Sequence, residues 1–308
     1  MVRNLVDKKE IVMNILDGKV VSEKILEDLK EKIDVLIKSN HLGYTISKPS
    51  IAIVIVGSNP ASETYVKAKM KACEKAGIEH KLMRFEETIT NFDLYNEVCK
   101  LNQSHFDGFI VQLPLPEHID ADAIIGAIDP SKDIDGFHPL NFGKMAIGQR
   151  SMRPATPYGI LKLIQHYNIE TKGKHVVVIG RSNLVGKPIS IMLGNDFGIG
   201  RSTVTSCDIN TPPELLKTQT RMADIIIVAV GKPNLLTVDM VKEGAVVIDV
   251  GINRTEDGKL VGDVDYDNVS KVTSWISPVP GGVGPMTVAG LILNTFESWK
   301  KRNLIEDL

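Results

Sequence analysis

A lysine at position 69 interrupts the apolar side of a predicted helix. Asn59 is typical of a helix N-cap and Gly77 of the residue just past a helix end, so residues 60–76 should form one helix. At about 100° per residue, Lys69 falls within the apolar arc, one turn after Tyr65. The simplest explanation is a lysine stem that reaches solvent past its neighbours. The alternative is an amine held in a cleft, where it takes part in chemistry.

Three polar residues lie at the end of the third predicted strand of the same region or in the segment after it. The strand 108–113 ends before Pro114, so Gln112 lies at its carboxyl end, where ligands collect in open α/β sheets. Asp133 and Asp135 follow in a segment rich in turn-forming residues, which predicts a loop. Residues of these types in such places often serve only as hydrogen-bonding or turn-capping groups.

A glycine turn in the second half of the chain is typical of a nucleotide-binding site. The predicted strand 174–179 ends at Gly180, and a predicted helix follows to about Asn195. This arrangement directs backbone N–H groups and a helix N-terminus at a phosphate. The spacing is not GxGxxG, so the glycines on their own also fit an ordinary turn. Further strands that alternate with helices favour a doubly wound nucleotide-binding sheet; they are 202–207, 224–230 and 245–250.

The order of the predicted elements indicates an α/β protein of two domains. A helix at 19–38 precedes three strands that alternate with helices, the pattern of a parallel sheet. A loop at 277–287, rich in proline and glycine, precedes an apolar helix that we expect to return to the first domain. We therefore expect a substrate domain of residues 1–153 and 286–308, a Rossmann-like NAD(P)-binding domain of residues 154–285, and a cleft between them.

The composition excludes several classes of protein. With 308 residues, 43% hydrophobic and 24% charged, the chain is an ordinary globular protein. A net charge of −2 gives no support for binding nucleic acid or an anionic membrane. Its three cysteines form no CxxC pair and its histidines no HxxxH spacing, so we expect neither a disulfide framework nor a metal site. The N-terminus lacks an apolar signal segment, and we expect a cytoplasmic metabolic enzyme.

Seven sequence blocks closely resemble those of the bifunctional methylenetetrahydrofolate dehydrogenase/methenyltetrahydrofolate cyclohydrolase family. Each block alone is weak, but all occur in the family's order and together span almost the whole chain. They are SxxYxxxK at 62–69, VQLPLP at 111–116, KDIDG at 132–136, GRSxxVGxP at 180–188, VGIN at 250–253, GDVD at 262–265 and PVPGGVGPMT at 278–287.

The resemblance implies a site for tetrahydrofolate derivatives and a dinucleotide. The catalytic set would be Lys69, Tyr65, Gln112 and Asp135, with Gln112 hydrogen-bonded to Lys69, Tyr65 stacked on the folate and Asp135 on the pterin ring. Further substrate contacts would be Val111, Leu113, Pro280, Gly281, Gly282, Val283 and Gly284. Cofactor contacts would be Gly180, Arg181, Ser182, Thr205 and Ile252. The resemblance also implies no metal and a homodimer, for which the predicted strand 202–207 offers an edge.

The two reactions of this family fit these residue types. Oxidation of 5,10-methylenetetrahydrofolate to 5,10-methenyltetrahydrofolate is a hydride transfer to a nicotinamide, which needs geometry more than acid–base help. Hydrolysis to 10-formyltetrahydrofolate adds water to a cationic carbon and needs a base that works near neutrality. A desolvated lysine beside a neutral amide is a candidate for that base. Both reactions belong to one-carbon metabolism, which supplies purine biosynthesis.

The expected cofactor is NADP⁺, with NAD⁺ as the alternative. Arg181 is placed to pair with a 2′-phosphate, whereas Asp208 follows the second nucleotide-domain strand, where a carboxylate accepts the ribose hydroxyls of NAD⁺. Asp208 is equally suited to be a turn former. The segment 197–201 lengthens a connection, and its Arg201 could add a second positive charge. The signals from Arg181 and Asp208 oppose each other, and the family resemblance favours NADP⁺.

Three other functions share parts of this pattern. A monofunctional dehydrogenase of the same family would keep both halves of the site. An NAD(P)-dependent dehydrogenase of another small substrate would keep the nucleotide half without needing Tyr65, Lys69, Gln112 and Asp135. A non-enzymatic nucleotide-binding regulator would have little reason to place a lysine in an apolar arc.

Overall fold

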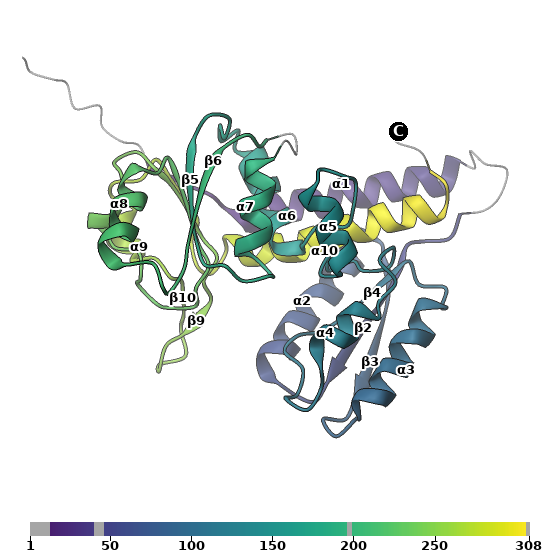
Figure 1. The fold of residues 1–308 in the computed structure, drawn as a ribbon. Coiled ribbons are helices and arrows are strands. Elements are labelled where there is room, and N and C mark those ends of the chain that lie inside the picture. Colours follow the sequence, from purple (N-terminus) through teal and green to yellow (C-terminus); the bar gives the residue numbers. More distant parts are fainter. Residues whose placement is uncertain (1–12, 40–45, 196–198, 306–308) are drawn as a thin grey trace, which may run out of the picture.

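The computed structural model describes residues 13–39, 46–195 and 199–305 (Figure 1). The predicted first domain therefore extends outside the described residues at 1–12, 40–45 and 306–308, as does the lengthened connection at 197 and 198. Two parallel sheets lie in different halves of the molecule, and the long helices α1 (Gly18–Ser39) and α10 (Val283–Arg302) run side by side between them (Figure 1). The predicted α/β fold class is confirmed.

The smaller sheet has three parallel strands in the order β3-β2-β4. Its elements are β2 (Ser50–Val56), α2 (Pro60–Ala76), β3 (Glu79–Phe85), α3 (Asn91–Asn102) and β4 (Gly108–Val111). All seven residues of the central strand β2 are buried, which explains its uninterrupted apolar sequence. Alternate residues face opposite sides: Ile51, Ile53 and Ile55 pack towards α2 and α10, and Ala52, Val54 and Val56 pack towards α3.

Helix α2 has the ends that its sequence predicts. The side-chain oxygen of Asn59 accepts hydrogen bonds from the N–H groups of Ala61 and Ser62, at 2.9 and 3.2 Å. Gly77 has a left-handed φ of 72°, and its N–H bonds back to the last turn of the helix. These two caps fix where the helix begins and ends, and therefore which residues face the sheet.

The larger sheet has six parallel strands in the order β1-β11-β8-β7-β5-β6. The predicted strands are β5 (His175–Ile179), β6 (Thr203–Cys207), β7 (Ile225–Val228) and β8 (Val246–Asp249). Two strands were not predicted, β1 (Asn14–Ile15) and β11 (Trp275–Ile276), because two residues leave no periodic pattern. Strand β1 pairs with β11, so this N-terminal segment lies in the second sheet instead of packing only with the first half of the chain.

The remaining elements surround the two sheets. They are α4 (Ala121–Gly126), α5 (Pro139–Ala146), α6 (Ala155–His166), α7 (Gly186–Gly194), α8 (Pro213–Met222), the 3-10 helix η1 (Val238–Met240), β9 (Asn253–Arg254), β10 (Leu260–Val261) and α9 (Tyr266–Val269). Strands β9 and β10 form a separate antiparallel ribbon, and α7 packs on the larger sheet.

Helix α10 belongs to the hydrophobic cores of both halves. It begins at Val283, inside the segment expected to be a loop, because Pro285 is compatible with the first turn of a helix. Its first turns, with Val283 and Met286, pack in the core beneath the larger sheet. Its later turns pack against the smaller sheet, where Trp299 is fully buried and its indole N–H donates to the Ser47 carbonyl at 2.8 Å. The helix therefore fixes the two sheets relative to each other.

Candidate active site

The fold brings Lys69, Gln112 and Asp135 together from three separate elements. Lys69, on α2, is only 6% exposed. Its Nζ donates a hydrogen bond to Gln112 Oε1 at 3.1 Å and lies 3.8 Å from Asp135 Oδ1. The simplest explanation of its place in the sequence, a side chain that extends past its neighbours to solvent, is therefore wrong. It is a buried amine between an amide and a carboxylate.

Gln112 is held in one orientation just beyond the end of β4. Its backbone N–H donates to Val54 O at 2.8 Å, and its side-chain Nε2 donates to Leu113 O at 2.7 Å. Because the amide nitrogen is used in this way, Oε1 is the atom directed at Lys69. The neighbouring Val111 is 4% exposed and packs in the core of the smaller sheet, so its side chain faces away from Lys69.

The two aspartates of the following loop have different surroundings. Asp133 is 1% exposed and organises the loop: its carboxylate accepts hydrogen bonds at 2.8 to 3.2 Å from the N–H groups of Gly136, Phe137 and His138 and from the Asn141 amide. Asp135 instead directs its carboxylate at Lys69. Burial raises the pKa of Asp135, while the positive charge of Lys69 acts in the opposite direction. The turn-capping explanation thus holds for Asp133 only.

Tyr65 lies one turn before Lys69 and lines a cavity of about 620 Å³. The cavity lies between α1, α2 and the segment 278–285, and it includes the predicted substrate contacts Pro280, Gly281, Gly282, Val283 and Gly284. Ile252, a predicted cofactor contact that is 45% exposed, lines the same cavity. Predicted substrate and cofactor residues therefore meet in one space.

Lys19, Lys71 and Arg254 also line this cavity and were not predicted as site residues. Lys71 falls on the arc of α2 that the sequence assigns to solvent, and Lys19 comes from a helix distant in sequence. Nothing in the local pattern of either residue indicates a site, because only the packing of α1 beside α2 places them together.

The turn after β5 joins a glycine in the left-handed region to the start of α7. Gly180 has a φ of 117°, and a side chain at this position would lie 2.2 Å from the Ala229 carbonyl oxygen. Helix α7 follows from Gly186, and the hydroxyl of Ser182 accepts a hydrogen bond from the Val185 N–H at 3.1 Å. A glycine turn that opens a helix presents backbone N–H groups to an anion.

Arg181 and Asp208 form an ion pair at the adjacent end of β6. The Arg181 guanidinium lies 3.1 Å from Asp208 Oδ2 and also donates to the Ser206 carbonyl oxygen at 2.6 Å. The other Asp208 oxygen accepts a hydrogen bond from the Asn210 N–H at 3.0 Å. Asp208 is therefore both a turn former and the partner of Arg181.

Two other residues predicted near the cofactor, Thr205 and Arg201, do not lie at the carboxyl end of β6. Thr205 is in the middle of the strand, where its hydroxyl bonds His175 Nε2 at 2.9 Å, so it is not at the carboxyl end. Arg201 precedes the strand and lies at its amino end. At about 3.3 Å per residue, a strand separates it from Asp208 by well over 10 Å. Arg201 thus does not supply a second positive charge beside Arg181.

Two buried carboxylates position the segment that carries Ile252. Asp249 accepts backbone N–H groups at 2.9 to 3.0 Å from Gly251, Asp263 and Val264. Asp263 accepts at 2.7 to 2.9 Å from the N–H groups of Val230 and Gly231 and from the Asn253 amide. Burial raises the pKa of Asp249 to about 6. The block GDVD at 262–265 gives no local sign of this role, because the partners of the Asp263 carboxylate come from two other segments, 230–231 and 253.

The described residues contain no group of three or more His, Cys, Asp or Glu side chains that could hold a metal ion. Within the same ranges, no helix combines the length and the apolar character needed to cross a membrane.

Both halves of the chain match known family models. Residues 16–135 match the model "Tetrahydrofolate dehydrogenase/cyclohydrolase, catalytic domain", and residues 154–303 match the NAD(P)-binding domain of the same name. The chain is 56% identical over 292 residues to Bifunctional protein FolD 1 of Geobacter metallireducens, with 94% of this chain and 98% of that protein covered.

Solved structures show the same relationship. The FolD methylenetetrahydrofolate dehydrogenase/cyclohydrolase of Campylobacter jejuni is 49% identical with a TM-score of 0.88, covering 94% of this chain and 100% of that one. The Trypanosoma brucei dehydrogenase-cyclohydrolase, solved with NADP and an inhibitor, is 33% identical with a TM-score of 0.87, covering 94% and 98%. The chain therefore belongs to the tetrahydrofolate dehydrogenase/cyclohydrolase family.

Proposed function

We infer that this protein is a bifunctional enzyme of one-carbon folate metabolism. It oxidises 5,10-methylenetetrahydrofolate to 5,10-methenyltetrahydrofolate with NADP⁺ and hydrolyses the product to 10-formyltetrahydrofolate. The observation that carries this inference is the buried amine of Lys69 between Gln112 and Asp135, in a chain that matches the family across both halves. The same match argues against a dehydrogenase of another substrate and against a non-enzymatic regulator.

One assay separates these functions. The protein is mixed with methylenetetrahydrofolate and NADP⁺, and the formation of the methenyl compound is followed by its absorbance. Hydrolysis of methenyltetrahydrofolate is then followed without the dinucleotide. A monofunctional dehydrogenase gives only the first signal, and a protein of another class gives neither.

We propose that the reaction takes place between two domains, residues 1–153 with 286–308 and residues 154–285. Strand β1 is an exception to this division, since it pairs in the second sheet. Tyr65 and the segment 280–284 would hold the folate, and the Gly180 turn fits a dinucleotide phosphate. When bound, NADP⁺ supplies the hydride acceptor. The protein's part in the oxidation is to orient the methylene carbon and to exclude water.

In the hydrolysis, Lys69 is the amine placed to take a proton as the oxygen of water bonds to the methenyl carbon. When the bond from that carbon to the ring nitrogen breaks, Lys69 returns the proton to the nitrogen, and the proton of the remaining hydroxyl leaves to solvent as the formyl C=O forms. Gln112 keeps the amine in position through its fixed Oε1. Asp135 offers a carboxylate to the amino-pyrimidine edge of the pterin.

Lys69→Met should lower the cyclohydrolase rate by about 10²-fold or more, because it removes the proton-transfer group and keeps the side-chain length. Folate binding and the unfolding temperature should change little. The matched control is Lys67→Met, the same change on the exposed arc of α2, which should leave both activities unchanged. Hydrolysis by Lys69→Met at a near-wild-type rate contradicts the proposed role.

Asp135→Asn should weaken folate binding by about tenfold or more, because a hydrogen bond to a charged group contributes about 1.5–3 kcal/mol. Binding is measured by fluorescence titration. Asp133→Asn provides the contrast: it should mainly lower the unfolding temperature, since Asp133 holds the loop together. An Asp135→Asn variant with unchanged folate affinity rules out the pterin contact.

The wild type should have a higher kcat/KM with NADP⁺ than with NAD⁺. Arg181→Ala should reduce NADP⁺ affinity while barely changing that of NAD⁺, because only NADP⁺ carries a 2′-phosphate for the guanidinium. Asp208→Asn should favour NADP⁺ further, since it removes a carboxylate that pairs with Arg181 and repels phosphate. A preference of tenfold or more for NAD⁺ in the wild type means that Asp208 faces the ribose. Equal losses for both cofactors in Arg181→Ala exclude the 2′-phosphate role.

We also propose a homodimer formed through the nucleotide-binding half. Strand β6 lies at the edge of the larger sheet, where its outer backbone groups are open to pairing with a second chain. Light scattering at micromolar concentration should give twice the chain mass of 33.8 kDa. A mass of one chain at that concentration refutes the proposal.

A further inference from the structure

Asp263 is fully buried, although neither reaction of the proposed function uses its side chain. Three hydrogen-bond donors surround its carboxylate. Oδ2 accepts from the Val230 and Gly231 N–H groups, at 2.7 and 2.9 Å, and Oδ1 accepts from the Asn253 amide at 2.8 Å. Because all three partners are donors, a carboxylate satisfies them, whereas the amide group of an asparagine would direct its own N–H groups at one of them.

The carboxylate joins the segments that follow two neighbouring strands. Val230 and Gly231 follow β7, and Asn253 comes shortly after β8, which pairs with β7. A side chain on Gly251 would lie 2.2 Å from Asp263 Cγ, so the backbone after β8 packs directly on the carboxylate. Asp263 therefore sets the distance between the two segments.

The joined segments reach both halves of the proposed site. A side chain on Gly180 would lie 2.2 Å from the Ala229 carbonyl oxygen and 3.5 Å from the Val230 side chain, so the end of β7 packs on the dinucleotide turn. In the other direction, the Ile252 side chain lies 3.9 Å from the place where a side chain on Gly284 would begin. A continuous line of contacts thus connects the dinucleotide turn to the folate segment, and the buried carboxylate is in its middle.

The order of the strands predicts where the nicotinamide lies. A dinucleotide with its phosphates at the Gly180 turn, after β5, and its adenosine beside Arg181, at the end of β6, extends past the ends of β7 and β8. This direction leads to Ile252, which lines the same cavity as Tyr65. The hydride acceptor and the methylene carbon should therefore meet beside the stretch that Asp263 holds.

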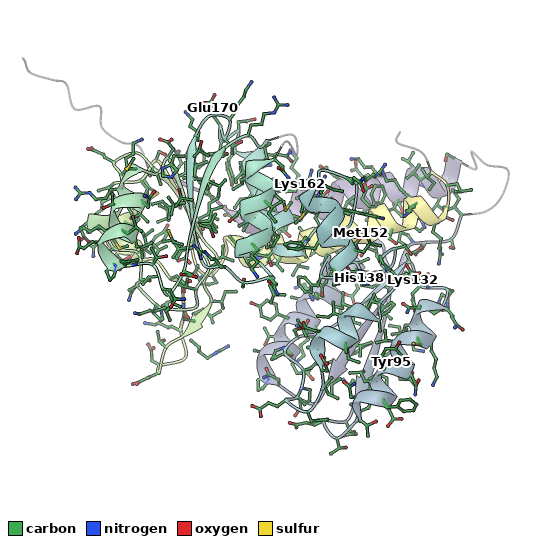
Figure 2. All side chains as sticks on the ribbon, viewed as in Figure 1. Tyr95, Lys132, His138, Met152, Lys162 and Glu170 are labelled. Atoms are coloured by element: carbon green, nitrogen blue, oxygen red, sulfur yellow. The ribbon has the colours of Figure 1, made fainter. Side chains whose placement is uncertain are left out.

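The amine of Lys69 is held independently of Asp263. Its two partners, an amide and a carboxylate, follow β4 in the half of the molecule with the smaller sheet. Figure 2 labels Lys132 and His138 in this half, on either side of Asp135 in the sequence. Within the described part of the chain, no residue that bonds the Asp263 carboxylate also bonds the Lys69 amine.

We propose that Asp263 is a positioning residue for the hydride transfer and not for the hydrolysis. The inference rests on the proposed function. In the oxidation, the methylene carbon gives up a hydride with its electron pair to the nicotinamide of NADP⁺, which is reduced as the folate is oxidised. Asp263 keeps Ile252 and the end of β7 in the place where they hold the nicotinamide against that carbon. Loss of this carboxylate should leave a protein that retains only the hydrolysis.

The test variant is Asp263→Asn, which keeps the size of the side chain and removes one acceptor. At saturating NADP⁺, its dehydrogenase kcat should fall about tenfold or more, because reacting atoms tolerate little misplacement. Hydrolysis of methenyltetrahydrofolate without dinucleotide should stay within about twofold of the wild type, since Lys69 and its partners are untouched. The Kd of NADP⁺, from calorimetric titration, should rise less than about threefold, since the Gly180 turn and Arg181 remain. The matched control is Asp267→Asn, the same change at an exposed carboxylate, which should alter none of the three quantities.

An exchange of the two side chains tests the hydrogen bond itself. In Asp263→Asn with Asn253→Asp, the amide and the carboxylate trade places. The oxygen of the new amide can face the Val230 and Gly231 N–H groups, while its nitrogen donates to the new carboxylate. The dehydrogenase kcat should recover to within about threefold of the wild type. An exchange variant as slow as Asp263→Asn overturns the proposal.

A second variant tests the same link without changing the buried carboxylate. Asn253→Ala removes one of the three hydrogen bonds and should lower the dehydrogenase kcat about threefold or more, again with unchanged hydrolysis. It keeps the test decisive if Asp263→Asn fails to fold, which the unfolding temperature shows.

Equal losses of both activities show a purely structural role, and unchanged dehydrogenase activity shows no role; either result overturns the proposal. A rise of about tenfold or more in the Kd of NADP⁺ makes Asp263 a binding residue and overturns the positioning role. A wild type without dehydrogenase activity refutes the proposed function itself. A wild type with both activities, beside variants that lose both or neither, refutes only the role of Asp263.

Discussion

The close approach of α6 and α10 is the constraint on which the rest of the structure depends. A side chain on Gly159 would lie 2.2 Å from the Met286 carbonyl oxygen, and one on Gly290 would lie 2.1 Å from the Ala155 carbonyl oxygen. Contacts this short do not occur, so only glycine allows the two helices to pack at this distance. Because α10 also belongs to both hydrophobic cores, this contact sets how the two sheets face each other.

The site inherits its geometry from that arrangement. Parallel strands direct their carboxyl ends to one edge of each sheet, and the residues that follow β8 line one cavity together with residues of α1 and α2. The amide of Asn294, on α10, holds the backbone of the Asp135 loop, while Lys69 reaches the same point from α2. A proton-transfer group needs placement within fractions of an ångström, and rigid elements provide it better than loops.

The buried charged side chains near Lys69 and in the nucleotide-binding half are stabilised in two different ways. Lys69 and Asp135 face each other, so each offsets part of the other's desolvation. Asp133, Asp249 and Asp263 instead accept several hydrogen bonds each and stay in place as structural carboxylates. Asp135 therefore faces the amine, whereas the other three carboxylates hold the backbone of their loops in place.

The sequence by itself determined most of the longer elements and one member of the site. The caps of α2, the apolar run of β2 and the position of Lys69 in an apolar arc depend on residues close together in the chain, so local periodicity and capping suffice. The motif blocks further indicated the family, and the family models and relatives confirm it.

Only the tertiary structure decided how distant segments meet. The difference between Asp133 and Asp135, the pairing of Arg181 with Asp208 and the place of β1 in the second sheet are not visible in any local pattern. The physical reason is that hydrogen bonds, ion pairs and desolvation depend on which groups lie within a few ångströms, and packing of the whole chain sets those distances.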